Sequence, residues 1–144
     1  MKITDLPYNL FLGIKESENS EYILQLDDSP KYLNHLETVH ASALFSLAEA
    51  TSGTFLISAF SDSSLIDNVV PVVRKVDVKY KKPSKGIVLS KATFNNIDSN
   101  EIILKLDQKG RVILDIKVEL FTEDGINVFE SIFTWFVQKI VKEK

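Results

Sequence analysis

The sequence predicts an α+β fold in which one long, enclosed helix packs against one curved antiparallel sheet. Residues 41–60, ASALFSLAEATSGTFLISAF, are apolar on every side of a helix rather than along one stripe, which is typical of a helix wrapped by other elements. After residue 64 the hydrophobic spacing changes to alternation, which indicates a run of strands. The 144 residues contain no repeat or linker, so we expect a single domain over residues 1–144.

Two short elements precede the long helix. Residues 4–12 predict a helix, with Thr4 or Asp5 as its cap and Pro7 in its first turn. Residues 21–27 alternate between apolar and polar positions, so we expect a strand there. A loop then leads into the long helix.

The first strand after the long helix is predicted over residues 72–81, beyond a loop at residues 61–64. Simple alternation would give it two distinct faces. One face holds Val72, Val76, Val78 and Tyr80, and the other holds Val73, Lys75, Asp77, Lys79 and Lys81. A turn at residues 83–86 leads to the next strand, residues 87–94.

The last third of the chain predicts a short helix and a hairpin. Residues 98–100 (Asp-Ser-Asn) cap a helix over residues 101–108, which Gly110 closes. Two cleanly alternating strands follow at residues 111–121 and 126–137, joined by an Asp-Gly turn. The charged tail after them is expected to fray.

Composition excludes several classes of chemistry. The chain has no cysteine, which rules out disulfides, thiolate catalysis and Cys-based zinc sites and fits a reducing compartment. Two histidines and five glycines argue against a metal cluster or a Gly-rich phosphate loop, so we expect no cofactor and no metal. The N-terminus shows no signal peptide, and the polar residues of the long helix argue against a membrane span. We therefore expect a cytoplasmic protein.

Charge is distributed unevenly along the chain. Residues 74–91 hold seven bases and one acid, a local charge of +6 in a chain of net −3, which leaves −9 elsewhere. A basic strip on an acidic protein indicates local recognition of an anionic partner, whereas the acidic remainder argues against a nucleic acid. The alternative is a strand edge that carries lysines against aggregation.

Glu49 is the only charged residue of the long apolar helix. An isolated carboxylate is costly to bury without a partner, and burial shifts its pKa, so such groups are candidate site residues. The segment just before the helix, residues 34–40 (NHLETVH), holds both histidines of the chain. Polar chemistry is thus concentrated at the start of one apolar helix.

This region resembles hotdog-fold acyl-CoA thioesterases, the superfamily of the phenylacetate-pathway and hydroxybenzoyl-CoA thioesterases. Its members carry an Asn or Gln, a Thr/Val-Leu-His-Gly-Gly turn, and an acid 15 residues after the amide. Asn34 and Glu49 have this spacing, with Thr38-Val39-His40 in the turn. The run TVHASALFSLAE is especially similar to a poorly characterised branch with Ala in place of Gly, and V-x-Y-x-K-P-x-x-G at residues 78–86 resembles a strand ending of that fold.

The resemblance implies a hotdog fold, with one central helix wrapped by a curved antiparallel sheet of about five to six strands. Two positions depart from the pattern. Ala41-Ser42 stand where Gly-Gly is usual, and Glu37 stands where the residue before Thr38 is usually Gly. A side chain at either place would narrow the substrate path.

The resemblance also suggests roles in thioester hydrolysis. Glu49 would act as general base or as nucleophile, the alternative being a buried Glu that caps an amide or pairs with a lysine. The backbone N–H of Ala41 would donate to the developing oxyanion. His40 would bond the thioester carbonyl or hold the turn, and Asn34 would orient the water or the carbonyl or close an Asx turn.

The expected partner is an acyl-CoA or another acyl thioester, whose phosphates would meet the basic strip. Arg74, Lys81, Lys82 and Lys85 are the candidate contacts. In hotdog proteins the helices of two subunits lie side by side, and each site takes its acid from one subunit and its amide and turn from the other. We therefore expect a homodimer or homotetramer.

Three functions remain open at this point. The first is thioester hydrolysis, and the second is binding of an acyl thioester without turnover, which the two departures motivate. The third, a hotdog hydratase, usually needs an acid shortly before a histidine, whereas Glu49 follows His40 and the residue five before His40 is His35. The floor of the substrate pocket is expected at Phe45 and Phe55, and Gly53 indicates close approach of another backbone.

Overall fold

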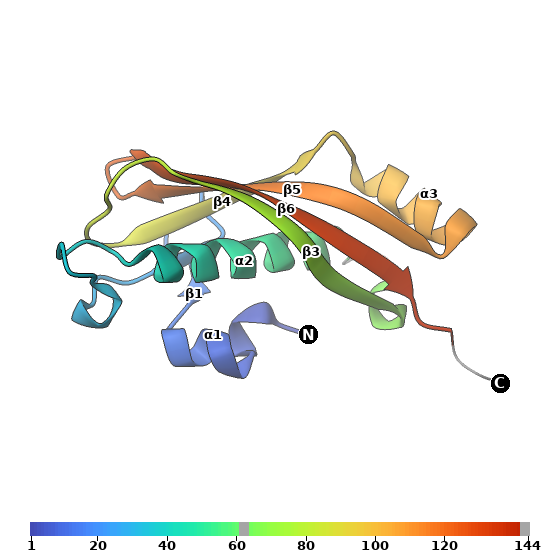
Figure 1. The fold of residues 1–144 in the computed structure, drawn as a ribbon. Coiled ribbons are helices and arrows are strands. Elements are labelled where there is room, and N and C mark those ends of the chain that lie inside the picture. The colour runs from blue at the N-terminus through green and yellow to red at the C-terminus, as the bar shows by residue number, and fades with distance from the viewer. Residues whose placement is uncertain (61–63, 142–144) are drawn as a thin grey trace.

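The structure is a computed structural model that describes residues 1–60 and 64–141 (Figure 1). It confirms the predicted α+β class. The elements are η1 (Ile3–Asp5), α1 (Pro7–Leu12), β1 (Lys15–Glu16), β2 (Leu24–Leu26), η2 (Pro30–Tyr32), α2 (Ala41–Ser58), η3 (Ile66–Asn68), β3 (Val69–Tyr80), β4 (Val88–Asn95), α3 (Ser99–Lys109), β5 (Arg111–Thr122) and β6 (Asn127–Lys139). The described strands form one six-stranded sheet in the order β1-β2-β4-β5-β6-β3. Every neighbouring pair is antiparallel.

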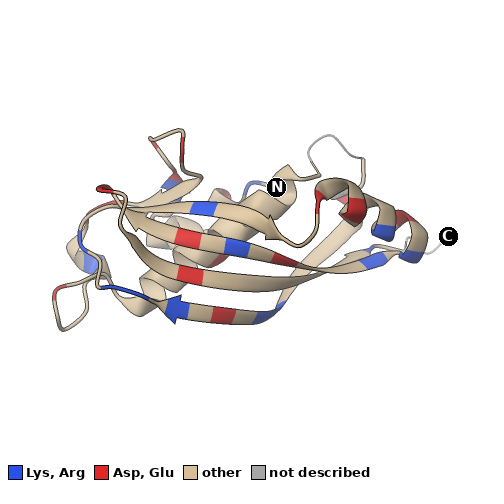
Figure 2. Ribbon diagram, turned by 90° about the horizontal axis from the view of Figure 1, so that it is seen from above, with Lys and Arg blue, Asp and Glu red and all other residues tan. Residues whose placement is uncertain are grey.

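Helix α2 lies along the concave face of the sheet, with α1 on its other side and α3 at one end of the sheet (Figure 1). Its apolar side chains fill the core together with the inward positions of β5, and Leu47, Ile116 and Val118 are fully buried. The outer face of the sheet instead carries both acidic and basic positions (Figure 2). This two-sided burial explains why α2 has apolar residues all round, whereas the long strands alternate.

Strand β3 differs from its predicted pattern because a β-bulge interrupts it. Val73 pairs with Trp135 and Lys75 with Thr134, so Arg74 is an extra residue without a partner on β6. The bulge reverses the alternation before it. Val73, and not Val72, therefore shares the inward face with Val76, and the predicted placement of these two valines was wrong.

Several local signals were read correctly and others were not. Asp98 caps α3 by accepting from the Glu101 N–H at 2.9 Å, and Gly110 closes it at φ 69°, as predicted. The predicted cap of α1 was wrong, because Leu6 occupies the cap position and Thr4 is buried, although Pro7 does lie in the first turn. Strand β2 is shorter than predicted, and β1 was not predicted. Most of the expected loop at residues 61–64 and the end of the charged tail lie outside the described residues.

The turn before α2 contains a backbone conformation that favours glycine. Glu37 adopts φ 58°, in the left-handed region, which costs a residue with a Cβ about 1–2 kcal/mol. The turn is held around it by Asn34, whose backbone N–H donates to the Thr38 carbonyl at 2.9 Å and whose carbonyl accepts from the Glu37 N–H at 3.1 Å. The usual Gly at this position is therefore explained by backbone geometry.

Replacing Glu37 by Gly is expected to stabilise the protein. The variant relieves the left-handed strain but has a more flexible unfolded chain, so we expect a net gain of about 0.5–1 kcal/mol in the free energy of unfolding. Urea denaturation measures the change. Glu37→Ala is the matched control, because it removes the same charge, keeps the Cβ and should bring no gain. A Glu37→Gly protein less stable than the wild type would contradict this assignment.

Candidate functional site

The start of α2 presents an unpartnered backbone donor. Ala41 is the first helical residue, and its N–H forms no hydrogen bond with another described residue. The next amide, that of Ser42, donates to Nδ1 of His40 at 3.0 Å, so His40 is the cap of the helix. Because Nδ1 accepts, the neutral imidazole carries its proton on Nε2. An exposed amide at the positive end of a helix and an exposed imidazole N–H can both donate to an oxygen.

Asn34 holds the turn that leads to this donor. Its Oδ1 accepts from the backbone N–H groups of Leu36 (2.9 Å) and Thr38 (3.2 Å), and its Nδ2 donates to the Thr38 hydroxyl at 3.0 Å. These bonds are those of an Asx turn, the alternative to a direct role. In the single chain Asn34 therefore positions the segment that carries His40 and Ala41.

Tyr80 also lies at the start of α2 and was not singled out from the sequence. Its hydroxyl donates to the Ala41 carbonyl at 3.4 Å, and its ring packs edge-on against Phe129 with centroids 5.3 Å apart. Half of the residue remains exposed. The tyrosine stands within the V-x-Y-x-K-P-x-x-G run, so its position was available, but nothing in the sequence placed that run beside Ala41.

Glu49 lines an apolar hollow of about 320 Å³. The other walls come from the N-terminal segment, from the second half of α2, and from β3 and β6. They include Met1, Ile3, Leu6, Gly53, Leu56 and Trp135. Gly53 leaves room between Ile3 and Trp135, because an added Cβ would lie 3.5 Å from Ile3 Cδ1 and 3.7 Å from Trp135 Cη2. The close approach at Gly53 thus comes from side chains, and the expected backbone contact was wrong.

The Glu49 carboxylate has no partner to offset its burial. It forms no ion pair or hydrogen bond with any other described residue, so neither alternative, pairing with a lysine or capping an amide, is present in the single chain. Burial in this apolar surrounding raises the pKa of Glu49 above its ordinary value of 4.5. A carboxylate with a raised pKa is a better base near neutral pH than an ordinary one.

One chain does not bring Glu49 and the Ala41 amide to a common point. Eight residues separate them on one helix, which corresponds to about 12 Å along the axis and a rotation of about 80°. An acyl carbonyl that accepts from the Ala41 N–H would therefore be out of reach of Glu49 of the same chain.

Other side chains of α2 have structural roles. Thr51 donates to the Leu47 carbonyl at 2.7 Å and Ser52 to the Glu49 carbonyl at 2.8 Å, the common behaviour of hydroxyls in helices. Phe45 and Phe55 were expected at the pocket floor, but they pack against Phe133 and Phe94, at centroid distances of 5.7 and 4.7 Å. Neither phenylalanine lines the hollow that holds Glu49.

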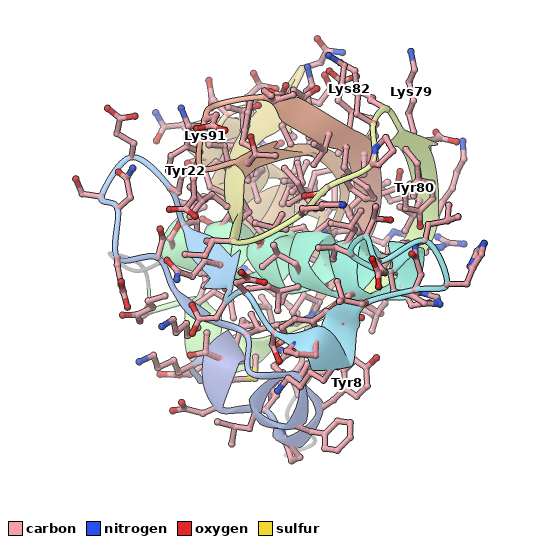
Figure 3. All side chains as sticks on the ribbon, turned by 90° about the vertical axis from the view of Figure 1, so that its left-hand side faces the viewer. Tyr8, Tyr22, Lys79, Tyr80, Lys82 and Lys91 are labelled. Atoms are coloured by element: carbon pink, nitrogen blue, oxygen red, sulfur yellow. The ribbon has the colours of Figure 1, made fainter. Side chains whose placement is uncertain are left out.

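The basic strip divides into separate parts. Lys79 and Lys82 point away from the molecule near the end of β3 (Figure 3). Lys81 is engaged, since its Nζ lies 2.7 Å from Oδ1 of Asn127 and 3.4 Å from Oε1 of Glu130. Lys85 borders a hollow of about 490 Å³ that Thr38 also lines, on the side of the turn before α2. Lys85 is therefore the member of the strip that lies beside the turn before α2, in a hollow that Glu123 and Asp124 also line.

Arg74 does not belong to this group. It lies at the β3 bulge, roughly 20 Å along the chain from Lys81 at the rise of an extended strand. Its guanidinium lies over the ring of Phe136, with Cζ 5.5 Å from the centroid. The structure thus separates Arg74 from the three lysines with which sequence reasoning grouped it.

Two further observations concern membrane spans and metal sites. Within the described residues no helix is both long and apolar enough to cross a membrane. Over the same residues, no three His, Asp or Glu side chains gather where a metal ion would be held.

Residues 11–137 match a family described as a domain of unknown function, DUF4442. The chain belongs to the DUF4442 family. No curated protein sequence matches this DUF4442 chain.

The DUF4442 chain is similar in structure to several solved proteins. A probable thioesterase of Pseudomonas aeruginosa superposes with a TM-score of 0.78 at 21% identity, covering 95% of this chain and 91% of the other. A thioesterase of Haemophilus influenzae gives 0.72 at 20% identity, covering 98% and 89%. A Bacillus halodurans protein solved with CoA gives 0.64 at 18% identity, covering 88% and 72%. These likenesses confirm the hotdog fold for the DUF4442 chain.

The raised pKa of Glu49 predicts a pH-dependent effect of Glu49→Gln on stability. A carboxyl with a higher pKa in the folded than in the unfolded state contributes stability that is complete below about pH 4.5 and is lost as pH rises through the folded pKa. At pH 7 the wild-type protein has lost this stability, whereas the variant has not, because its glutamine does not titrate. Glu49→Gln should therefore be more stable than the wild type at pH 7, and the difference should shrink as pH falls toward 4.5. Denaturation of both proteins across this range tests it, and a difference independent of pH would contradict it.

Proposed function

We propose that this protein hydrolyses an acyl-CoA, or a related acyl thioester, to the free acid and the thiol, as a single hotdog domain acting in a homodimer or homotetramer. The observation that carries the proposal is the pair of unsatisfied groups on α2, the exposed Ala41 N–H at its start and the unpaired Glu49 carboxylate in an apolar hollow. Thioester hydrolysis needs a donor for the oxyanion and a base for water, and these groups supply one of each.

The distance between the two groups supports a site shared by two copies. Since about 12 Å of helix separates them, a second α2 lying antiparallel to the first would bring the Glu49 of one chain to the Ala41 of the other. Each dimer would then contain two equivalent sites.

The surface also supports association. Strand β3 is 12 residues long and pairs only with β6 in the described sheet, so one of its edges is open. Open edges of this length invite pairing with another chain. Exposed apolar side chains lie at α1, in the turn before α2 and on β3; they are Leu6, Leu10, Phe11, Leu36, Val70 and Val72.

The chemical step follows from these positions. The Glu49 carboxylate takes a proton from a water molecule while the water oxygen attacks the thioester carbonyl carbon. The carbonyl oxygen becomes an oxyanion that accepts from the Ala41 N–H of the other chain, with the exposed Nε2–H of that chain's His40 as a second donor. The tetrahedral intermediate then expels the thiolate, which takes the proton from Glu49. Direct attack by Glu49 to give an anhydride, followed by hydrolysis, reaches the same products.

The two ends of the substrate have separate surroundings. The apolar hollow beside Glu49 suits an acyl chain, whereas Lys85 lies beside the turn that leads to Ala41 and, with the outward-pointing Lys82 nearby in the chain, suits the phosphates of a carrier. Lys81 is less available to bind a phosphate, because Glu130 already pairs with it. Asn34 acts by holding the turn, and Tyr80 borders the place where the thioester would lie.

Thiol release from short, medium, long and aromatic acyl-CoAs is the direct test. We expect turnover of at least one class, and a rate that falls as pH drops through the raised pKa of Glu49. Glu49→Gln should lower kcat by about 100-fold or more, the usual contribution of a general base. Glu21→Gln, at an exposed site away from α2, is the matched control and should keep full activity.

No thiol release from any substrate, with acyl-CoA binding retained, would overturn the hydrolase proposal and favour an acyl-thioester-binding protein. Release that Glu49→Gln leaves intact would overturn the assignment of the base.

Ala41→Pro tests the oxyanion donor without disturbing the helix. Proline is favoured at the first helical position, and His40 already has the extended conformation (φ −61°, ψ 139°) that a following proline requires. The variant should therefore fold normally, lack the N–H, and lose about 10²–10³ in kcat. Circular dichroism provides the control for folding.

Mixing the two inactive variants tests the shared site. When Ala41→Pro and Glu49→Gln chains are co-expressed, a mixed dimer contains one intact site and one doubly defective site, so activity should recover to about a quarter of the wild type. A site within one chain would show no recovery. Sedimentation of the wild type at micromolar concentration should show a dimer or larger species, and a 16.3 kDa species alone would contradict the assembly.

A further inference from the structure

A second group of cations lies away from the proposed thioester site. Arg74 from the β3 bulge, Lys105 and Lys109 from α3, and Arg111 from the start of β5 line one hollow of about 450 Å³. We call it the basic hollow. Basic positions of α3 and β5 gather at the end of the sheet that carries α3 (Figure 2). The hollow that holds Glu49 has a different set of walls and shares no lining residue with this one.

The basic hollow also has an apolar floor. Ile113 is 56% exposed on the outer face of β5, and it pairs with Phe136 on β6. The Arg74 guanidinium lies over the Phe136 ring at 5.5 Å. Exposed apolar surface and a stacked guanidinium offer a platform for a flat ring, and the surrounding ammonium groups suit an anion.

The charges of the basic hollow are not neutralised. No acidic residue lines it, and none of its four cations forms an ion pair within the described part of the chain. Helix α3 holds two acids: Asp107 is occupied by Lys139 at 2.8 Å, and Glu101 lies in the first turn of the helix and does not line the hollow. The negative end of the α3 dipole explains a cation such as Lys109 in the last turn of that helix. It does not explain Arg74 and Arg111, because both lie on strands. Four cations around one hollow, in a chain of net −3, make a locally positive surface that favours an anion.

We propose that the basic hollow binds a nucleotide, with its phosphates on Lys105, Lys109 and Arg111 and its base on the floor of Ile113 and Phe136 beside Arg74. A volume of about 450 Å³ falls in the usual range of small-molecule sites. The nucleotide is either free or part of a larger molecule such as CoA, and only this second source depends on the proposed function.

Fluorescence anisotropy with an N-methylanthraniloyl ATP probe measures the binding directly, without any need for turnover. We expect saturable binding that weakens as salt is raised, because phosphate contacts are screened. The double variant Lys105→Gln/Lys109→Gln should raise the Kd at least about tenfold. Lys75→Gln/Lys117→Gln is the matched control, since it removes two cations from the sheet outside the hollow and should leave the Kd unchanged.

Competition with unlabelled CoA separates the two sources. Displacement of the probe by CoA, together with a raised KM and unchanged kcat for acyl-CoA in the Lys105→Gln/Lys109→Gln variant, identifies the nucleotide part of CoA. Probe binding that persists in saturating CoA, with KM unchanged, identifies a free nucleotide.

The proposal is overturned if the wild type does not bind the probe at millimolar concentration, or if the double variant and its control bind equally well. Absence of thioesterase activity would leave the binding result intact, so the two proposals fail separately.

Discussion

The enclosure of α2 is the constraint on which the rest of the structure depends. A helix with a sheet on one side and an N-terminal segment on the other has little access to water, so its polar groups need partners within the protein. Thr51 meets the Ser90 hydroxyl at 2.7 Å, and that hydroxyl in turn accepts from the Leu24 N–H, which ties the helix to two strands. Ser52 accepts from the Trp135 indole at 3.2 Å. The Glu49 carboxylate has no hydrogen-bond partner of this kind. Its charge is unpaired because the residues packed around it are apolar.

The start of α2 is organised in the opposite way. There the backbone is exposed, and the side chains around it hold its geometry: His40 caps the helix, Asn34 closes the turn, and Tyr80 rests on the Ala41 carbonyl. Donors fixed in this way need little reorganisation when charge develops on a bound oxygen, which is the physical basis of oxyanion stabilisation. The strained Glu37 is consistent with this, since a turn fixed by several bonds tolerates one unfavourable residue.

Much of the fold was predictable because its signals are local. The all-round apolar character of α2, the alternation of β5 and β6 and the caps of α3 each depend on neighbouring residues. The isolated charge of Glu49 also marked it without any knowledge of tertiary contacts. The walls around it were not predictable, because Ile3 and Trp135 are brought to Gly53 from the two ends of the chain. For the same reason Tyr80 was missed beside Ala41, and Arg74 was grouped with lysines from which the fold separates it.

The bulge at Arg74 has a consequence for how this gene can tolerate change. Substitution at position 74 alters one exposed side chain, because that residue has no partner on β6. Loss of its codon would also leave the pairing intact, because Val73 and Lys75 already pair with consecutive residues of β6, Trp135 and Thr134. Val73 would still face the core and Lys75 the outer side, so the strand would alternate regularly without the bulge. Position 74 is therefore constrained by its guanidinium, which lines the basic hollow, and not by the pairing of the strand.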